Sequence, residues 1–201
     1  MKKIINIVLL LAIAASCKAQ NPVFDISENR GTENLTGAYY KDMYNLLNPF
    51  EGTYIYTNGN TSLKIVLQKK VRSTINNNRY YYDYLIGEYQ YIENGIEKVN
   101  TLNKLNINYS DARDYSIGGD LIISKGNTGC FECLPNEKAL SAGMVDGASE
   151  NIAQLIIRRI MVNNQPAIKI WLMWEMVAIR EGAPEHIHAS IPGGYYTLLK
   201  Q

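Results

Sequence analysis

The stretch that decides the fold is Phe50-Glu51-Gly52-Thr53-Tyr54-Ile55-Tyr56, which leads from a proline turn into an alternating run. Pro49 prevents a preceding helix from continuing, and Gly52 permits a positive φ or a close approach of two backbones. Tyr54 and Tyr56 then share one face, and the residues between them share the other, which is the period of a β-strand. The sequence therefore predicts a first strand with an aromatic plug at its start.

The residues that follow alternate in the same way and are separated by hairpin turns. Asn58-Gly59 and Asn94-Gly95 supply the conformations that two-residue hairpin turns need. Between these turns lie residues 61–70, which are apolar on one face, and residues 79–91, which are rich in tyrosine on both faces. Gly87 interrupts the second run and predicts a bulge or a bend. The pattern predicts consecutive antiparallel strands.

The last third of the chain is the most apolar part and predicts three further strands. Residues 152–162 fit a helix or a strand, and their many isoleucines favour a strand. Residues 168–177 are apolar on both faces and need a helix, a loop or another subunit as outer cover. Residues 195–200 predict a final strand that closes against the first. The glycine- and alanine-rich residues 140–148 predict a loop.

Together these runs predict a mainly β fold, an antiparallel meander of about eight to ten strands. Closure into a barrel removes the exposed edges of such a sheet, and an open sandwich is the alternative. Residues 37–47 carry apolar side chains at helical spacing and predict a short N-terminal helix that caps the open end of the sheet. An irregular surface segment is the alternative for these residues.

The N-terminus has the pattern of an export signal. Residues 1–16 combine two lysines, an apolar run of about a dozen residues and a small-residue ending, and this run is shorter than the roughly 20 residues of a spanning helix. The ending before Cys17 resembles the lipobox of bacterial lipoproteins, which implies acyl chains on Cys17. Cleavage after Ala19 and secretion of a soluble protein is the alternative. The lipobox reading predicts a protein anchored in the cell envelope, with the outer membrane as the expected location.

Composition divides the remaining chain into two parts. Residues 17–36 are polar and aperiodic and predict a flexible tether, and residues 37–201 are long enough for one β-rich domain. The formal net charge of +1 becomes slightly negative without the signal, and no extended basic cluster is present. These features exclude nucleic acid as an expected partner. They make no prediction of the oligomeric state.

Cys130 and Cys133 are the only thiols left once Cys17 is acylated, and outside the cytoplasm they predict a disulfide. A redox pair of the thioredoxin type requires a βαβ context that the sequence lacks. A zinc site would have to recruit His186 and His188 from a distant part of the chain.

Other polar residues give no catalytic or metal-binding pattern. Asp111, Asp114 and Asp120 lack the spacing of a calcium loop and predict solvated loop charges. No nucleophile, base and orienting group can be combined from their spacing. We therefore predict no metal, no cofactor and no enzymatic activity.

The aromatic residues are the candidates for ligand contact. A tyrosine ring is largely apolar, but its hydroxyl needs a partner when buried, so a row of tyrosines fits a packed core or a ligand-binding wall. Two functions follow: a non-catalytic structural or interaction module of the envelope, or a carrier of a small apolar or amphipathic ligand. The residues that would line the cavity of such a carrier are Tyr54, Tyr56, Tyr80, Tyr82, Tyr84, Trp171 and Trp174.

Two resemblances extend this reading. Phe50-x-Gly52-x-Tyr54 resembles the first-strand motif of lipocalins and fatty-acid-binding proteins, with tyrosine in place of their tryptophan. Ser16-Cys17-Lys18-Ala19-Gln20, Lys41-Asp42 and Gly87-Glu88-Tyr89-x-Tyr91-x-x-Asn94-Gly95 resemble a family of small flavobacterial (Bacteroidetes) envelope lipoproteins with a domain of unknown function. The second resemblance implies an envelope lipoprotein and carries no catalytic residues across.

Overall fold

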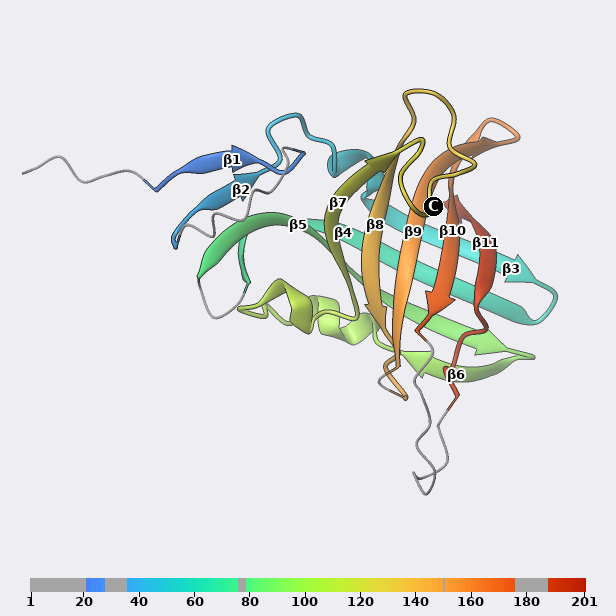
Figure 1. Ribbon diagram of the computed structural model, residues 1–201. Helices are drawn as coiled ribbons and strands as arrows, with labels where there is room; N and C mark the ends of the chain where they lie inside the picture. Colours follow the sequence, from blue (N-terminus) through green and yellow to red (C-terminus); the bar gives the residue numbers. More distant parts are fainter. Residues whose placement is uncertain (1–20, 28–35, 76–78, 150, 176–187) are drawn as a thin grey trace, which may run out of the picture.

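The computed structural model describes residues 21–27, 36–75, 79–149, 151–175 and 188–201, which form one eleven-stranded sheet and three short 3-10 helices (Figure 1). The strands are β1 (Val23–Asp25), β2 (Tyr39–Lys41), β3 (Gly52–Asn58), β4 (Thr61–Ile75), β5 (Tyr80–Glu93), β6 (Ile96–Asn100), β7 (Ile117–Ser124), β8 (Lys138–Val145), β9 (Ile152–Val162), β10 (Gln165–Trp174) and β11 (Gly194–Lys200). The 3-10 helices are η1 (Asn48–Phe50), η2 (Leu102–Asn106) and η3 (Ala112–Asp114). Within these ranges, no helix has the length and apolar character needed to cross a bilayer.

Eight of the strands close into an antiparallel barrel in the order β5, β4, β3, β11, β10, β9, β8, β7. The ring closes where Ile86 of β5 pairs with Gly118 of β7, and where Leu199 of β11 pairs with Ile55 of β3. The predicted closed barrel and the predicted pairing of the last strand with the first are therefore confirmed. Lipocalins also close eight antiparallel strands into a barrel.

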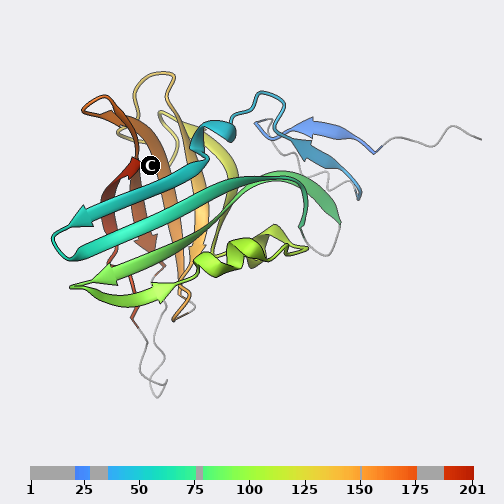
Figure 2. The ribbon, with the colours of Figure 1, turned by 180° about the vertical axis from the view of Figure 1, so that it is seen from behind.

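Strand β5 organises the sheet because three strands share one of its edges. β4 follows the other edge along almost the whole of β5. On the shared edge, β2 pairs at Tyr81 and Tyr82, β7 pairs at residues 85–87, and β6 pairs at residues 90–93. Figure 2 shows the long curve of β5 along this side of the barrel. The N-terminal strands β1 and β2 thus extend the sheet beyond the closed ring.

Gly87 lies where β5 meets β4 and β7, and the strand pairing continues through it. The predicted bulge is wrong, because the register of β4 and β5 shifts between Lys70 and Ser73 instead. A Cβ atom on Gly87 would lie 2.6 Å from Leu67 Cδ2 and 2.8 Å from the carbonyl oxygen of Val66. The glycine is required for close packing at the closure of the barrel.

The barrel encloses a side-chain core. Tyr54 has an exposed fraction of 2%, and its hydroxyl donates a hydrogen bond to the carbonyl oxygen of Phe50, 3.0 Å away. Burial of each large apolar side chain contributes about 1.5 to 3 kcal/mol to folding. The largest fully buried side chains are Tyr54, Tyr89, Phe50, Leu47, Leu63, Ile65, Leu67, Leu85, Ile117, Leu140, Met144 and Leu155.

The short helix predicted for residues 37–47 is wrong. Tyr39–Lys41 form β2, which pairs in parallel with β1 and β5. The carboxylate of Asp42 then accepts hydrogen bonds from the backbone N–H groups of Leu46 and Leu47, at 2.6 and 3.0 Å. This side chain binds the backbone donors itself and forms a turn in place of a helix. β1 lies inside the segment that the sequence predicts as a tether.

The loop predicted for residues 140–148 is also wrong, because Lys138–Val145 form β8. Its small residues are needed for strand packing: a Cβ atom on Gly119 of β7 would lie 2.7 Å from Ala142 Cα. The strands predicted at 152–162 and 195–200 are present as β9 and β11.

Candidate functional site

The loop between β7 and β8, residues 125–137, covers part of the outer face of the barrel (Figure 1). Cys130 and Cys133 form a disulfide within it, and both are buried against Ile156 of β9. Gly129 has a φ of +86°, and a Cβ atom there would lie 2.8 Å from the Ile156 side chain. The disulfide and the glycine together hold this disulfide loop close to the sheet, and the loop is the outer cover that the sequence predicts for β10.

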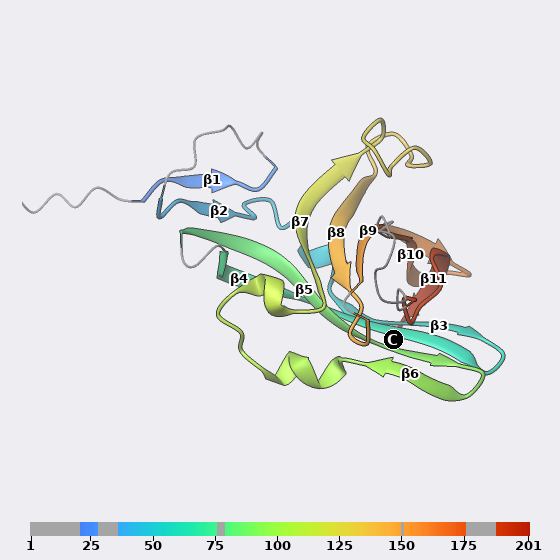
Figure 3. The same cartoon turned by 60° about the horizontal axis from the view of Figure 1, so that its bottom comes forward.

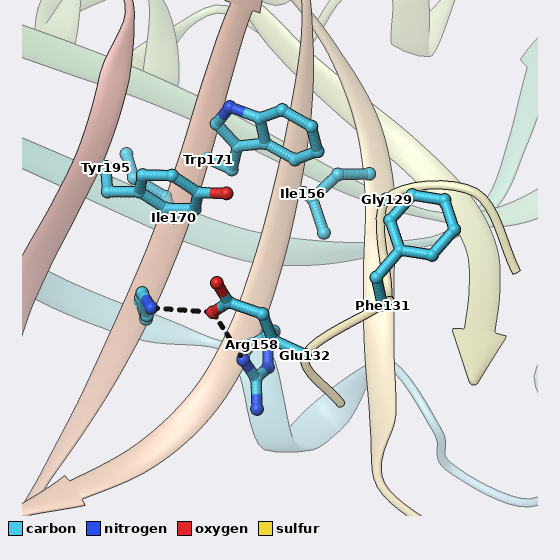
Figure 4. A pocket seen from close by; sticks show the side chains of 9 residues that line it. Gly129, Phe131, Glu132, Ile156, Arg158, Ile170, Trp171 and Tyr195 are labelled. Atoms are coloured by element: carbon cyan, nitrogen blue, oxygen red, sulfur yellow. Dashed lines mark hydrogen bonds and ion pairs between the residues drawn. The ribbon is translucent and has the colours of Figure 1, made fainter. Parts of the chain in front are cut away.

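A groove of about 130 Å³ lies between the disulfide loop and β9, β10 and β11. Trp171 and Tyr195 are direct partners across β10 and β11, and their rings stack with centroids 5.6 Å apart. Figure 4 shows both rings facing Phe131 of the loop across Ile156. Tyr195 is 55% exposed and Phe131 is 70% exposed. We call this site the aromatic groove; its lining residues are Gly129, Phe131, Glu132, Ile156, Arg158, Lys169, Ile170, Trp171 and Tyr195.

Ion pairs fix the polar side of the aromatic groove. Lys169 Nζ lies 2.9 Å from a carboxylate oxygen of Glu132, and Arg158 contacts both Glu132 and Glu137, at 3.5 and 2.7 Å. The hydrogen bond from Lys169 lowers the pKa of Glu132, and the hydrogen bond from Arg158 lowers the pKa of Glu137. The two cations are balanced by two carboxylates, so the groove combines an apolar wall with a rim of compensated charges.

The arrangement suits the insertion of an apolar side chain. Tryptophan, tyrosine and arginine are the residues enriched at binding hot spots between proteins, and Trp171, Tyr195 and Arg158 supply all three types. Small-molecule pockets have volumes of roughly 300–1,000 Å³, well above that of the aromatic groove. Across the described residues, no group of three or more His, Cys, Asp or Glu side chains could hold a metal ion. Recognition by packing is therefore the chemistry that this site offers.

The aromatic residues predicted for a ligand cavity pack mostly in or against the barrel core and do not share one cavity. Tyr54 is in the core, and Tyr56 packs edge-on against Tyr196 at 5.2 Å. Tyr82 stacks on Tyr40 of β2 at 4.6 Å, and Tyr80 packs edge-on against Tyr82. The structure therefore gathers Tyr80 and Tyr82 beside Tyr40 of β2, in the same hydrophobic cluster as Tyr54.

Of the remaining three predicted residues, Tyr84 and Trp174 line one hollow of about 510 Å³, and Trp174 also packs against the core. Tyr84 packs beside Tyr115, next to η3, which lies along the outer side of β5 (Figure 3). Trp174 donates a hydrogen bond from Nε1 to the carbonyl oxygen of Ile191, 2.8 Å away. Trp171 alone among the seven lines the aromatic groove.

Sequence reasoning missed the partners of Trp171. The alternation of residues 168–177 places Trp171 on the face opposite Ile170, but only the register of β10 with β11 brings Tyr195 beside it. Phe131 and Glu132 stand between the two cysteines, so a tight loop there could be expected, although its position over β9 could not. Cys17 and His186 lie outside the described residues.

One charge prediction needs correction. Asp111 is an N-cap, because its side chain accepts a hydrogen bond from the backbone N–H of Arg113, and Asp114 is exposed. Asp120, however, is only 6% exposed, because it lies within β7. The prediction of a solvated loop charge is wrong for Asp120.

The fold and the groove define a class of protein, an antiparallel β-barrel domain with a packed core and an aromatic groove on its outer wall. The chain belongs to a family of unknown function (DUF6705), which it matches over residues 1–201. Comparison with curated proteins and with solved structures found no match.

Proposed function

We propose that this protein is a non-catalytic interaction module of the cell envelope, anchored by acyl chains on Cys17, that binds a partner protein through the aromatic groove. The observation that carries the proposal is the division of aromatic side chains between the two faces of the barrel. Tyr54 and Tyr89 fill the interior with exposed fractions of 2% and 0%, whereas Phe131 and Tyr195 face solvent on the outer wall.

The rigidity of the aromatic groove supports protein binding. The disulfide at Cys130 and Cys133 constrains the loop wall, and paired strands hold Trp171 and Tyr195. A partner that inserts a side chain therefore orders few groups on this protein, which reduces the entropic cost of association. Because the charges of the rim are already paired with each other, the partner does not need a particular charge to bind the groove.

The position of β1 supports a short connection to the membrane. Val23 begins β1 and lies six residues after Cys17 in the sequence. A fully extended chain of that length spans at most about 20 Å, since each residue adds at most about 3.3 to 3.6 Å. With acyl chains on Cys17, β1 would start within about that distance of the lipid.

A lipocalin-like carrier is the second candidate, and the closed eight-stranded barrel supports it. Because side chains fill the barrel interior, a carried ligand would have to bind in a hollow on the barrel surface. Native mass spectrometry of protein purified gently from its host tests the carrier directly. A reproducible small-molecule adduct, absent from a folded Trp171→Ala variant, would favour the carrier over the interaction module.

Photo-crosslinking in the host cell tests the interaction module. A photoreactive amino acid replaces Phe131 at the edge of the aromatic groove, and a matched control replaces Ile96 of β6, which is 63% exposed. We expect one discrete protein adduct from position 131 and none of the same mass from position 96. Adding Trp171→Ala to the position-131 protein should reduce the adduct at least about tenfold, because hot-spot truncation costs about 2 kcal/mol or more.

Two results would contradict the proposed function. Position 131 could give no adduct in cells that contain the folded protein, or the same adduct could persist at full yield with Trp171→Ala. Either result would remove the aromatic groove as a partner-binding site.

A further inference from the structure

A second hollow lies at the end of the barrel where the disulfide loop, the β9–β10 hairpin, η1 and the end of β11 meet (Figure 1). Its volume is about 550 Å³. We call this region the basic end. The residues lining the hollow are Pro49, Tyr54, Leu134, Glu137, Arg158, Arg159, Ile160, Met161, Pro166, Ala167 and Lys200.

Two cations of the basic end form no ion pair among the described residues, although Arg159 lies close enough to Glu137 to lower the pKa of that carboxyl. Arg159 is exposed, and its guanidinium lies over the ring of Phe50, 5.5 Å from the centroid. Lys200 Nζ donates a hydrogen bond to the backbone carbonyl oxygen of Glu51, 2.7 Å away. Arg158 differs from both, because Glu137 balances its charge. The lining of the hollow therefore carries an excess of positive charge.

Exposed apolar side chains border the same hollow. Leu134, directly after the disulfide, is 67% exposed, and Met161, near the end of β9, is 63% exposed. Pro49 and Pro166 are exposed beside them. Figure 1 shows the disulfide loop and the β9–β10 hairpin projecting from the same end of the barrel. Large apolar side chains that project beside an excess of positive charge are a costly arrangement for a surface that meets only water.

We propose that the basic end rests on the anionic surface of a lipid bilayer. Leu134 and Met161 enter the headgroup region, where apolar side chains gain burial, while Arg159 and Lys200 face the lipid phosphates. Charge complementarity favours this occupant, because an anionic bilayer presents negative charge in a plane above apolar chains. A free phosphate would match the cations alone and leave both apolar side chains in water.

This contact goes beyond the proposed anchor, since it requires no acyl chain. An acyl anchor and the basic end would act together, because a tether of about 20 Å keeps the domain near the bilayer. Two weak attachments to one surface strengthen each other through effective concentration. The aromatic groove lies on the outer wall of the barrel and the basic end lies at one end of it. Binding of a partner protein and binding of a bilayer are therefore tested separately.

Vesicle co-sedimentation tests the proposal with residues 17–201 carrying Cys17→Ser, which removes both the apolar signal segment and the acylated thiol. The probes are vesicles of phosphatidylcholine alone and of phosphatidylcholine with about one third phosphatidylglycerol. We expect binding to the anionic vesicles only, with a loss at high salt because screening weakens exposed charges. Equal binding to both vesicle types, or binding to neither, would overturn the proposal.

Two double variants examine the two parts of the contact. Arg159→Gln with Lys200→Gln should lower the partition coefficient about 25-fold, at about fivefold for each cation near an anionic surface. Leu134→Ser with Met161→Ser, both at exposed positions, should lower it at least about tenfold through lost apolar burial.

Ile96→Ser with Lys98→Gln on β6 is the matched control and should leave binding unchanged. Circular dichroism confirms that each variant is folded; if Lys200→Gln unfolds the chain, Arg159→Gln alone should still give the fivefold loss. If either contact pair fails to weaken binding, or if the control weakens it equally, the proposal is wrong. A negative result here would leave the crosslinking test of the aromatic groove unaffected.

Discussion

Replacement of Tyr89 by phenylalanine should weaken the end of the barrel opposite the disulfide loop. Tyr89 is fully buried, and its hydroxyl lies 3.1 Å from Asp146 Oδ1 and accepts a hydrogen bond from the backbone N–H of Gly147 at 2.9 Å. Burial raises the pKa of Tyr89, so the hydroxyl remains protonated and can donate to the carboxylate. It thereby links β5 to the turn between β8 and β9.

The magnitude follows from the groups that lose a partner. Tyr89→Phe leaves the part-buried N–H of Gly147 without its acceptor and removes one hydrogen bond from the buried Asp146 carboxylate, and a hydrogen bond to a charged group contributes about 1.5 to 3 kcal/mol. Asp146 keeps hydrogen bonds from Ser149 and from the backbone of Ser190, so its own loss is smaller. We expect a total loss of about 2 to 3 kcal/mol, or a fall in Tm of about 4 to 12 °C for a chain of this size.

Urea unfolding followed by tryptophan fluorescence measures this loss, with Tyr91→Phe as the control. Tyr91 lies on the same strand and is 3% exposed, but its hydroxyl lies 3.5 Å from Glu93, at the limit of a hydrogen bond. The control should change the unfolding free energy by less than about 0.5 kcal/mol. If Tyr89→Phe shares the urea midpoint of the wild type or of Tyr91→Phe, the hydroxyl does not hold this end of the barrel.

Four further outcomes are expected. Burial opposes the charged form of Asp146, but its hydrogen bonds outweigh burial and lower its pKa below 3.8. The stability that Asp146 contributes is therefore complete above the unfolded-state pKa and is lost as pH falls through the lower folded value. Acid unfolding of Asp146→Asn should lack this pH-dependent loss of stability. Replacement of Cys130 and Cys133 by serine should cost about 2 kcal/mol in urea unfolding and increase hydrogen exchange in residues 125–137, and unchanged exchange would contradict the role of the disulfide. Gly87→Ala should cost about 1 to 3 kcal/mol through overpacking against Leu67, measured as a lower urea midpoint. Cys17→Ser should abolish metabolic labelling by palmitate, and persistent labelling would exclude Cys17 as the acylated residue.

Strand periodicity made much of the barrel predictable. The alternation after Gly52 and the Asn-Gly turns locate β3, β4, β5 and β6, because a period of two residues follows directly from the geometry of a strand. β8 could not be predicted in this way, since the small residues around Ala142 are selected by close contact with Gly119. The turn at Asp42 was missed because a side-chain carboxylate competes with helix formation only in the folded arrangement.

The candidate site was less predictable than the fold. Alternation alone could assign Trp171 to the face opposite Ile170, but its pairing with Tyr195 depends on the register between β10 and β11. The tyrosines of β5 share one residue type, and still Tyr80, Tyr89 and Tyr91 are buried in the core, whereas Tyr84 packs on the outer face beside Tyr115. Residue type therefore predicted aromatic packing, while sheet closure determined which aromatic side chains reach solvent.

The extension formed by β1 and β2 has a mechanical consequence. It joins the ring where Tyr39 and Tyr40 pair with β5, where the Tyr40 ring stacks on Tyr82, and through the carboxylate of Asp83, which accepts hydrogen bonds from the Tyr39 hydroxyl and the backbone of Asp42. The ring itself closes through β5 and β7 without β2. Tension applied at the N-terminal side of β1 would therefore detach two short strands before it opened any pair of barrel strands. Under a pulling force, the extension would therefore detach first and the barrel would remain folded.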